Sequence, residues 1–235
     1  VSCDLVSAPQ DIFQGRIGPV KVNGKDWKSS RGLTCRAIEA SVDTCQIDMG
    51  RILSDQKLVL TKPAEGKCMI AFTAHDFGNF IVHPRLEKAK LKASRAAGSH
   101  SSQMPSTESS SPSLIDFRQE NVAIDPKDGT VTFYASCAGT LCKCVLQRTG
   151  NTEGRKSFVD VTILESSSKD QLTASRLSEV FTDFFNEIVF EMYDGLLLSF
   201  RDMMVTNKGQ SPSVLLSLNI CVQKFPSPAV RPSDF

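Results

Sequence analysis

Cysteine is the residue type in this sequence with the widest chemical potential, since thiolates bind metals, attack substrates and form disulfides. The chain of 235 residues has eight, four on each side of a Ser-rich stretch near residue 100. An even number in each half of a chain this size is typical of disulfides formed in an oxidising compartment. We therefore predict disulfide bonds, leaving the pairing open, with reduced thiols in a cytosolic protein as the alternative. The candidates are Cys3, Cys35, Cys45, Cys68, Cys137, Cys142, Cys144 and Cys221.

The closest cysteine spacing lies in 137–144, where Cys142 and Cys144 are separated by one residue. A structural zinc site needs two close pairs of ligands, such as two Cys-x₂-Cys motifs, and no second close pair occurs. On a strand, the side chains of Cys142 and Cys144 would point to one face, which suits two disulfides with different partners. We therefore predict no metal and no cofactor.

Histidine, the usual general base, occurs only at His75, His83 and His100. The sequence has no Gly-x-Ser-x-Gly nucleophile motif and neither of the glycine-rich phosphate-binding motifs. His75 and Asp76 could form an acid–base pair, but a surface loop is the simpler interpretation. We predict that the protein is not an enzyme, with a disulfide-dependent hydrolase, or an inhibitor of one, as the remaining alternative.

The charge and hydropathy of the chain exclude two kinds of partner. Lys and Arg number 27 and Asp and Glu number 26, a formal net charge of +1. A protein that binds duplex nucleic acid needs a basic excess on one face, so we expect no nucleic-acid partner. No apolar stretch approaches the length of a membrane span, so we expect no direct membrane insertion.

Several features indicate the secretory pathway. The sequence begins with Val1 rather than Met, from which we expect that a leader has been removed. It contains no Asn-x-Ser/Thr glycosylation site. Together with the cysteine content, these features predict a protein that is secreted, or that resides in a secretory organelle or at the cell surface.

Alternation of apolar and polar residues predicts many short strands. The clearest is 130–137, where Val131, Phe133, Ala135 and Cys137 share one face and four hydroxyl-bearing residues, among them Tyr134, share the other. Further strands are predicted over 33–40, 57–62, 67–73, 158–164 and 213–223.

Turn residues lie between these segments. Asn23-Gly24 separates two short extended runs and predicts a type I′ hairpin turn. The segment 125–129 (Asp-Pro-Lys-Asp-Gly) predicts a second hairpin, leading into the strand at 130. Short strands joined by such turns favour a mainly β protein, a disulfide-stabilised antiparallel β-sandwich.

One segment has helical periodicity. Between residues 174 and 192, apolar side chains recur at intervals of three and four, which predicts an amphipathic helix. Ser168 is a candidate N-cap and Gly195 a candidate terminator. Packing of the apolar stripe on a sheet is the simpler interpretation, and a partner-binding face is the alternative.

Composition suggests the organisation of the chain. Residues 93–113 are rich in Ser, Ala and Pro and predict a disordered insert. Residues 226–235 form a Pro-rich tail. We predict one β-sandwich domain over 1–225 with this insert and tail. The alternative is two small β domains over 1–92 and 114–225, since each half holds four cysteines.

These features together resemble the adhesin-associated proteins of apicomplexan micronemes. The shared features are the eight cysteines, the many short strands, the absence of glycosylation sites, the Ser-rich insert and the Pro-rich tail. The resemblance implies a galectin-like β-sandwich and a role as non-enzymatic partner of a transmembrane adhesin, supporting its trafficking and host-cell attachment. No functional residue is carried over, because the His-x-Asn-Pro-Arg residue types of galectins occur in a different order within 75–85.

The leading functional prediction is therefore a secreted, non-enzymatic protein-binding module. Aromatic residues concentrate binding energy at interfaces, so Trp27 and Tyr193 are the candidate partner-binding residues. Both could equally belong to the core. The alternative function is a β-sandwich that binds a carbohydrate or another small ligand.

Overall fold

The computed structural model describes most of the chain and shows a mainly β protein whose sheets are antiparallel. The chain divides into two compact units, both discontinuous in sequence. Unit 1 comprises Val1–Ala71, Val189–Arg201 and the residues from Leu216 on, and unit 2 comprises Phe72–Ile188 and Asp202–Leu215. The described residues are 1–29, 32–99, 115–137, 139–149, 158–167, 171–207 and 211–225.

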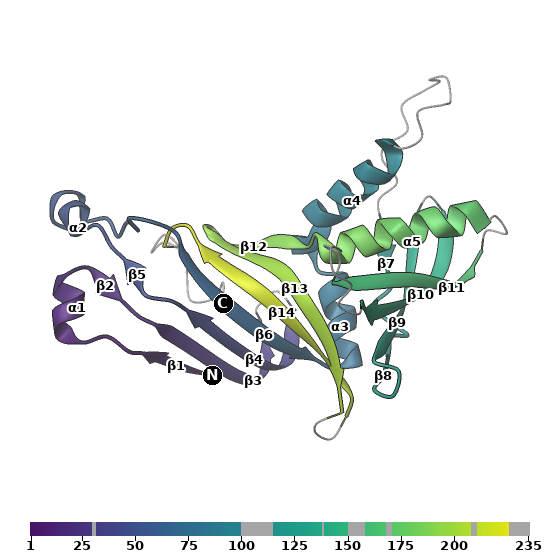
Figure 1. Ribbon diagram of the computed structural model, residues 1–235, viewed down its shortest axis with the longest axis horizontal. Coiled ribbons are helices and arrows are strands. Elements are labelled where there is room, and N and C mark those ends of the chain that lie inside the picture. Colours follow the sequence, from purple (N-terminus) through teal and green to yellow (C-terminus); the bar gives the residue numbers. More distant parts are fainter. Residues whose placement is uncertain are drawn as a thin grey trace. The chain divides into compact units, whose positions relative to one another are not determined.

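A seven-stranded sheet dominates unit 1 (Figure 1). The pairs β1–β3, β3–β4, β4–β6 and β12–β13 are antiparallel, and β13 and β14 also contribute residues to unit 2. In sheet order the strands are β1 (Ser2–Leu5), β3 (Val20–Lys28), β4 (Thr34–Val42), β6 (Ala64–Phe72), β14 (Ser213–Val222), β13 (Leu196–Thr206) and β12 (Val189–Tyr193).

Period-two alternation divides this sheet into an apolar and a polar face. On the apolar face, one row of directly opposed residues crosses four strands as Cys3, Val22, Ala40 and Cys68. On the polar face, the neighbouring row is Asp4, Lys21, Ser41 and Lys67. A slip by one residue in any pair would exchange the two faces, so the alternation fixes the register.

The remaining elements of unit 1 are short. Strands β2 and β5 form a two-stranded ladder, and a small cluster of Cys45, Leu60 and Ala64 packs with Val42 and Val222. The elements are α1 (Pro9–Phe13), β2 (Arg16–Ile17), β5 (Cys45–Gln46) and α2 (Met49–Asp55).

Unit 2 combines a five-stranded sheet with helices. The sheet order is β11-β10-β9-β7, and β8 also pairs with β9. The strands are β7 (Asp116–Phe117), β8 (Ala123–Asp125), β9 (Thr130–Cys137), β10 (Thr140–Arg148) and β11 (Val159–Ser166). The helices are α3 (Ala74–Ile81), the 3₁₀ turn η1 (Pro84–Leu86), α4 (Glu87–Ser99) and α5 (Gln171–Asn186).

Helix α5 is joined to the edge strand β11 by hydrogen bonds as well as by packing. The N–H of Val161 donates to Thr182 Oγ1 at 2.8 Å, and Ser178 Oγ donates to the carbonyl of Val161. Asn186 accepts from the N–H of Val159 at 3.1 Å and donates to its carbonyl at 2.7 Å. Helix side chains therefore satisfy backbone groups on the outer side of β11, which protects this edge.

The core of unit 2 is aromatic. The ring of Phe117 lies 4.9 Å from that of Phe184, 5.8 Å from Phe133 and 6.0 Å from Phe185, centroid to centroid. The ammonium of Lys90, a residue only 7% exposed, lies 5.2 Å from the Phe117 ring centre. Phe117 thus joins the sheet to α5 and α4.

Most of the sequence-predicted strands are confirmed. Strand β9 has the predicted bounds, and β4, β6, β11 and β14 match their predictions to within a few residues. The strand predicted over 57–62 is wrong, because that segment forms only an isolated bridge between Leu60 and Ile47. The predicted hairpin at 125–129 is confirmed by the pairing of β8 with β9.

The turn predicted at Asn23-Gly24 is wrong, because both residues lie inside β3. A Cβ at Gly24 would lie 2.9 Å from the Ile38 side chain on the neighbouring strand, so this glycine permits close packing rather than a turn. The chain instead reverses after Lys28, where the N–H of Ser29 donates to the carbonyl of Leu33 at 2.8 Å.

The predicted amphipathic helix is confirmed, but its C-terminal bound is wrong. Helix α5 ends at Asn186 and Val189 begins β12. Gly195, with φ at +84°, lies in the β12–β13 turn rather than at the helix end. The candidate N-cap Ser168 lies outside the described residues.

Part of the expected disordered insert is helical. Helix α4 continues through Ser99, so the prediction of disorder from residue 93 is wrong for its first seven residues. Residues 100–114 and the Pro-rich tail, 226–235, lie outside the described part of the chain. Each unit takes residues from both sides of this insert.

Candidate functional site

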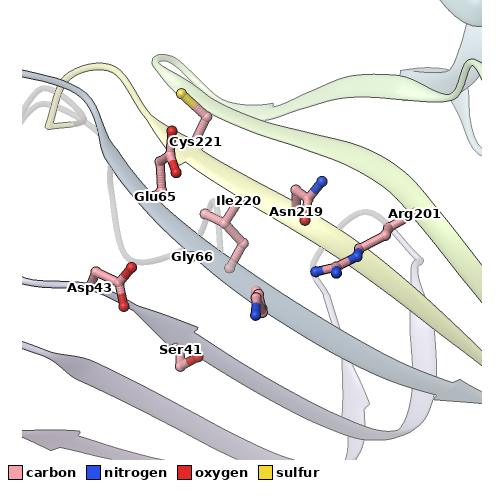
Figure 2. Close-up of a pocket in the computed structure, with 9 residues that line it drawn as sticks. Ser41, Asp43, Glu65, Gly66, Arg201, Asn219, Ile220 and Cys221 are labelled. Carbon is pink, nitrogen blue, oxygen red and sulfur yellow. The ribbon is translucent and has the colours of Figure 1, made fainter.

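A polar pocket of about 540 Å³ opens on unit 1 (Figure 2). Its residues come from β4 and the residue after it, and from β6, β14 and β13, which are adjacent strands of the sheet. They are Ser41, Asp43, Glu65, Gly66, Lys67, Arg201, Asn219, Ile220 and Cys221.

Strand register places four of these residues in two directly opposed pairs. The Val42–Gly66 pair continues one step further, where the N–H of Asp43 donates to the carbonyl of Glu65 at 2.8 Å. Asp43 and Glu65 therefore lie opposite each other, and we call them the acidic row. Ser41 lies opposite Lys67, two residues along each strand.

The other side of the pocket is formed by β14 and β13. Asn219 is exposed on β14 beside the buried Ile220, so it belongs to the polar face. Arg201 is exposed on β13. Figure 2 shows Asn219 and Arg201 on one side of Gly66, and Glu65 with Cys221 toward the other. We call Lys67 and Arg201 the basic row.

Gly66 allows the two central strands to approach closely. A Cβ at this position would overlap the backbone of Ser41 and lie 2.9 Å from the Cα of Val42. Any larger residue would push β6 from β4 and would disturb the floor of the pocket.

The charged side chains of the pocket form no ion pairs with one another. Ion pairs among the described residues include Lys92–Glu187, Lys143–Glu165, Arg148–Asp202 and Lys224–Asp194. None of them includes a residue of the acidic or basic row. Four charges therefore face the solvent of one pocket without a partner of opposite sign among the described residues.

The eight cysteines are thiols in the structure, so the predicted disulfides are absent from it. Cys3 is exposed and Cys221 is half-buried, and the other six are buried. Burial raises the pKa of Cys68 to about 12, with a smaller contribution from Cys35. Burial likewise raises the pKa of Cys144 to about 12, with a smaller contribution from Cys142. Ionisation of the buried thiols is thereby opposed.

The sequence-predicted partner residues are far apart in the sheet of unit 1. Trp27 is half-buried on β3, opposite Cys35. Tyr193 is the last residue of β12, and its side chain lies outside the described part. Four strands separate β3 from β12 in the sheet order. Neither residue lines the pocket.

The histidines have structural surroundings. The Asp76 carboxylate, the possible acid–base partner of His75, accepts hydrogen bonds from Thr73 in the capping box of α3. The His75 ring instead lies 3.3 Å from the Asn79 side-chain amide. His83 is buried and accepts from the N–H of Arg85, and His100 lies outside the described residues.

The described residues form neither a metal-binding cluster nor a membrane-spanning helix. No group of three or more His, Cys, Asp or Glu side chains is placed to hold a metal ion. Among the described helices, none has the length and apolar character needed to cross a membrane.

A second surface of interest is the free edge of the sheet. Strand β1 pairs with β3 on one side, and no described strand pairs with its other side. All four of its residues are exposed, and the flanking Val1 and Val6 are 80% and 62% exposed. Exposed apolar side chains thus occur where backbone groups are also unpaired.

Comparisons with known proteins identify no relative of this chain. No family model, no curated protein and no solved structure matches this chain. The functional assignment therefore depends on the geometry of the pocket and of the β1 edge.

Proposed function

We propose that this protein is a non-enzymatic protein-binding module, and that the β1 edge accepts an extended segment of its partner as an additional strand. The observation that supports the proposal is the coincidence of an unpaired sheet edge with exposed apolar side chains at β1. Strand addition at such an edge is a common mode of peptide recognition.

The hydrogen-bond pattern shows which backbone groups are available to a partner. The N–H of Val6 donates to the carbonyl of Pro19 at 3.2 Å, one step beyond the Leu5–Val20 pair. Because bonded pairs alternate along an antiparallel ladder, Asp4 and Ser2 also bond toward β3. The N–H and C=O groups of Cys3 and Leu5 therefore point away from the sheet, toward an incoming strand.

The apolar face supplies the side-chain contacts. Exposure on this face rises toward the edge, from Cys68 at 4% through the half-buried Ala40 and Val22 to Leu5 at 54%. A partner strand with alternating apolar residues would continue this face and bury Leu5. Backbone bonds would provide affinity, and the apolar side chains would select the register.

The partner class follows the resemblance found in the sequence. We assign the added strand to an extended segment of a membrane-anchored adhesin, whose trafficking and attachment this protein would support in the secretory pathway. The secretory location, the disulfide bonds and a galectin-like arrangement of the sheets are part of this proposal. Peptide mapping under non-reducing conditions, on protein from its native source, tests the disulfides.

Site-specific photocrosslinking tests the edge. A benzoylphenylalanine at Leu5 is expected to crosslink to an adhesin segment, whereas the same residue at Leu53 is expected not to. Leu53 is the matched control because it is 82% exposed in the same unit but lies on α2, away from the edge. A synthetic peptide of the crosslinked segment should then slow hydrogen exchange at the amides of Cys3 and Leu5.

Leu5→Lys is expected to weaken binding of that peptide at least about tenfold, because lysine on an edge strand opposes pairing and removes the buried apolar contact. Leu53→Lys should leave the affinity unchanged. Crosslinks from Leu53 alone, or only to a second copy of this chain, would contradict the proposal.

The alternative of carbohydrate binding has no comparable support. Sugar rings are held by stacking on aromatic side chains as well as by polar contacts, and no aromatic residue lines the pocket. Trp27, the only tryptophan of the chain, lies elsewhere on β3.

A further inference from the structure

The polar pocket of unit 1 has a charge pattern of its own and lies on other strands than the β1 edge. Its acidic row, Asp43 and Glu65, consists of two like charges directly opposite each other on neighbouring strands. Such a pair is destabilising, and no ion pair of the described residues compensates it. A cationic group placed between the two carboxylates would relieve this repulsion.

The basic row would instead be neutralised by an anionic group. Lys67 follows Glu65 by two residues on β6, and Arg201 reaches the same pocket from β13. Arg201 is exposed and makes no ion pair with the described residues. Its guanidinium has the planar donor geometry that binds a carboxylate through two parallel hydrogen bonds.

The separation of the rows sets the length of a ligand. Glu65 and Lys67 are two residues apart on β6, about 7 Å along the strand, so the cationic and anionic groups of a ligand that bridges them should be about that far apart. A single inorganic ion would satisfy only one row. Ser41, opposite Lys67, and Asn219, beside Arg201 (Figure 2), add a hydroxyl and an amide on the side of the basic row.

We propose that this pocket binds a small zwitterion of dipeptide size, with its ammonium on Asp43 and Glu65 and its carboxylate on Arg201 and Lys67. A dipeptide places its terminal charges at about this separation, and Ser41 and Asn219 would add polar contacts near its carboxylate end (Figure 2). Binding at this pocket is independent of strand addition at β1, so either proposal can fail without the other.

The test is an NMR titration of the full chain with L-alanyl-L-alanine, its N-acetyl derivative and its C-terminal amide. The dipeptide is expected to shift the amide resonances of Gly66 and Asn219, with a Kd of about 1 mM, as is usual for so small a ligand. Each derivative lacks one charge and should bind at least about tenfold more weakly. Equal affinities for the three compounds, or no shift at about 10 mM dipeptide, would overturn the proposal.

Two variants assign the charges to their rows. Arg201→Gln should weaken dipeptide binding and abolish the difference between the dipeptide and its amide. Glu65→Gln should instead abolish the difference between the dipeptide and its N-acetyl derivative. The matched controls are Glu39→Gln and Lys25→Gln, on exposed strand positions outside the pocket.

The controls should leave all three affinities unchanged, and thermal unfolding should show that every variant is folded. If Arg201→Gln and Glu65→Gln weakened all three compounds by the same factor, the orientation of the zwitterion would be wrong. If the controls had the same effect as the pocket variants, the site itself would be wrong.

Discussion

Replacement of Phe117 by alanine is expected to lower the free energy of unfolding of unit 2 by about 3–5 kcal/mol, the usual cost of removing a large aromatic side chain from a core. Phe117 is only 3% exposed, and its ring contacts those of Phe133, Phe181, Phe184 and Phe185. The substitution would leave a cavity between the sheet and α5, and Lys90 would lose the aromatic face beneath its ammonium.

Equilibrium unfolding in urea, followed by circular dichroism, measures this loss. Phe117→Leu should cost less, because leucine fills part of the cavity. Phe158→Ala is the matched control: Phe158 belongs to the same unit but is 43% exposed, so its removal should change stability by about 1 kcal/mol or less. Equal losses for Phe117→Ala and Phe158→Ala would show that the aromatic cluster does not hold unit 2 together.

The strands that the sequence predicts well are those whose alternation is local and uninterrupted. In β9, four residues, Val131, Phe133, Ala135 and Cys137, alternate with half-exposed ones over the whole strand. Because the period of two determines which side chains can be buried, one strand can be recognised without knowing its neighbours. The same reasoning identified β14.

The secondary-structure predictions are wrong where a local sequence signal competes with tertiary packing, which cannot be seen in the sequence. Asn23-Gly24 has the composition of a tight turn, but Gly24 is needed inside β3 because Ile38 on β4 fills the space of a side chain. Val189 continues the helical spacing of α5, yet it starts β12, where the buried Phe190 follows it. In both segments the local signal is compatible with two structures, and tertiary contacts decide between them.

The pocket was not predictable from the sequence. Its charged residues occur at positions 43, 65, 67 and 201, and no spacing along the chain connects them. They meet because β4, β6, β14 and β13 are neighbours in the sheet. A partial signal was present: Glu65 and Lys67 alternate with Cys68 and Ile70 on one strand, which marks them as polar-face residues.

The buried thiols should make the reduced protein sensitive to alkaline pH. Burial raises the pKa of Cys68 to about 12 from a usual value of 9.0. Below pH 9.0 the thiol is protonated in the folded and the unfolded chain, and stability is unaffected. Above it, the unfolded chain loses the proton first, so stability falls as the pH rises toward 12. At about pH 10.5 the loss should be about 2 kcal/mol.

Cys144 provides the same test in unit 2, because its pKa is also raised to about 12 by burial. Urea unfolding of the reduced protein at about pH 8 and pH 10.5 measures the loss, and Cys68→Ala and Cys144→Ala should each remove about 2 kcal/mol of it. Cys3→Ala is the control, because Cys3 is exposed.

Since lysines and tyrosines also titrate in this range, the quantity to compare is the difference in stability loss between each variant and the parent chain. If the Cys68→Ala and Cys144→Ala profiles ran parallel to the parent's, these thiols would not be buried as protonated groups.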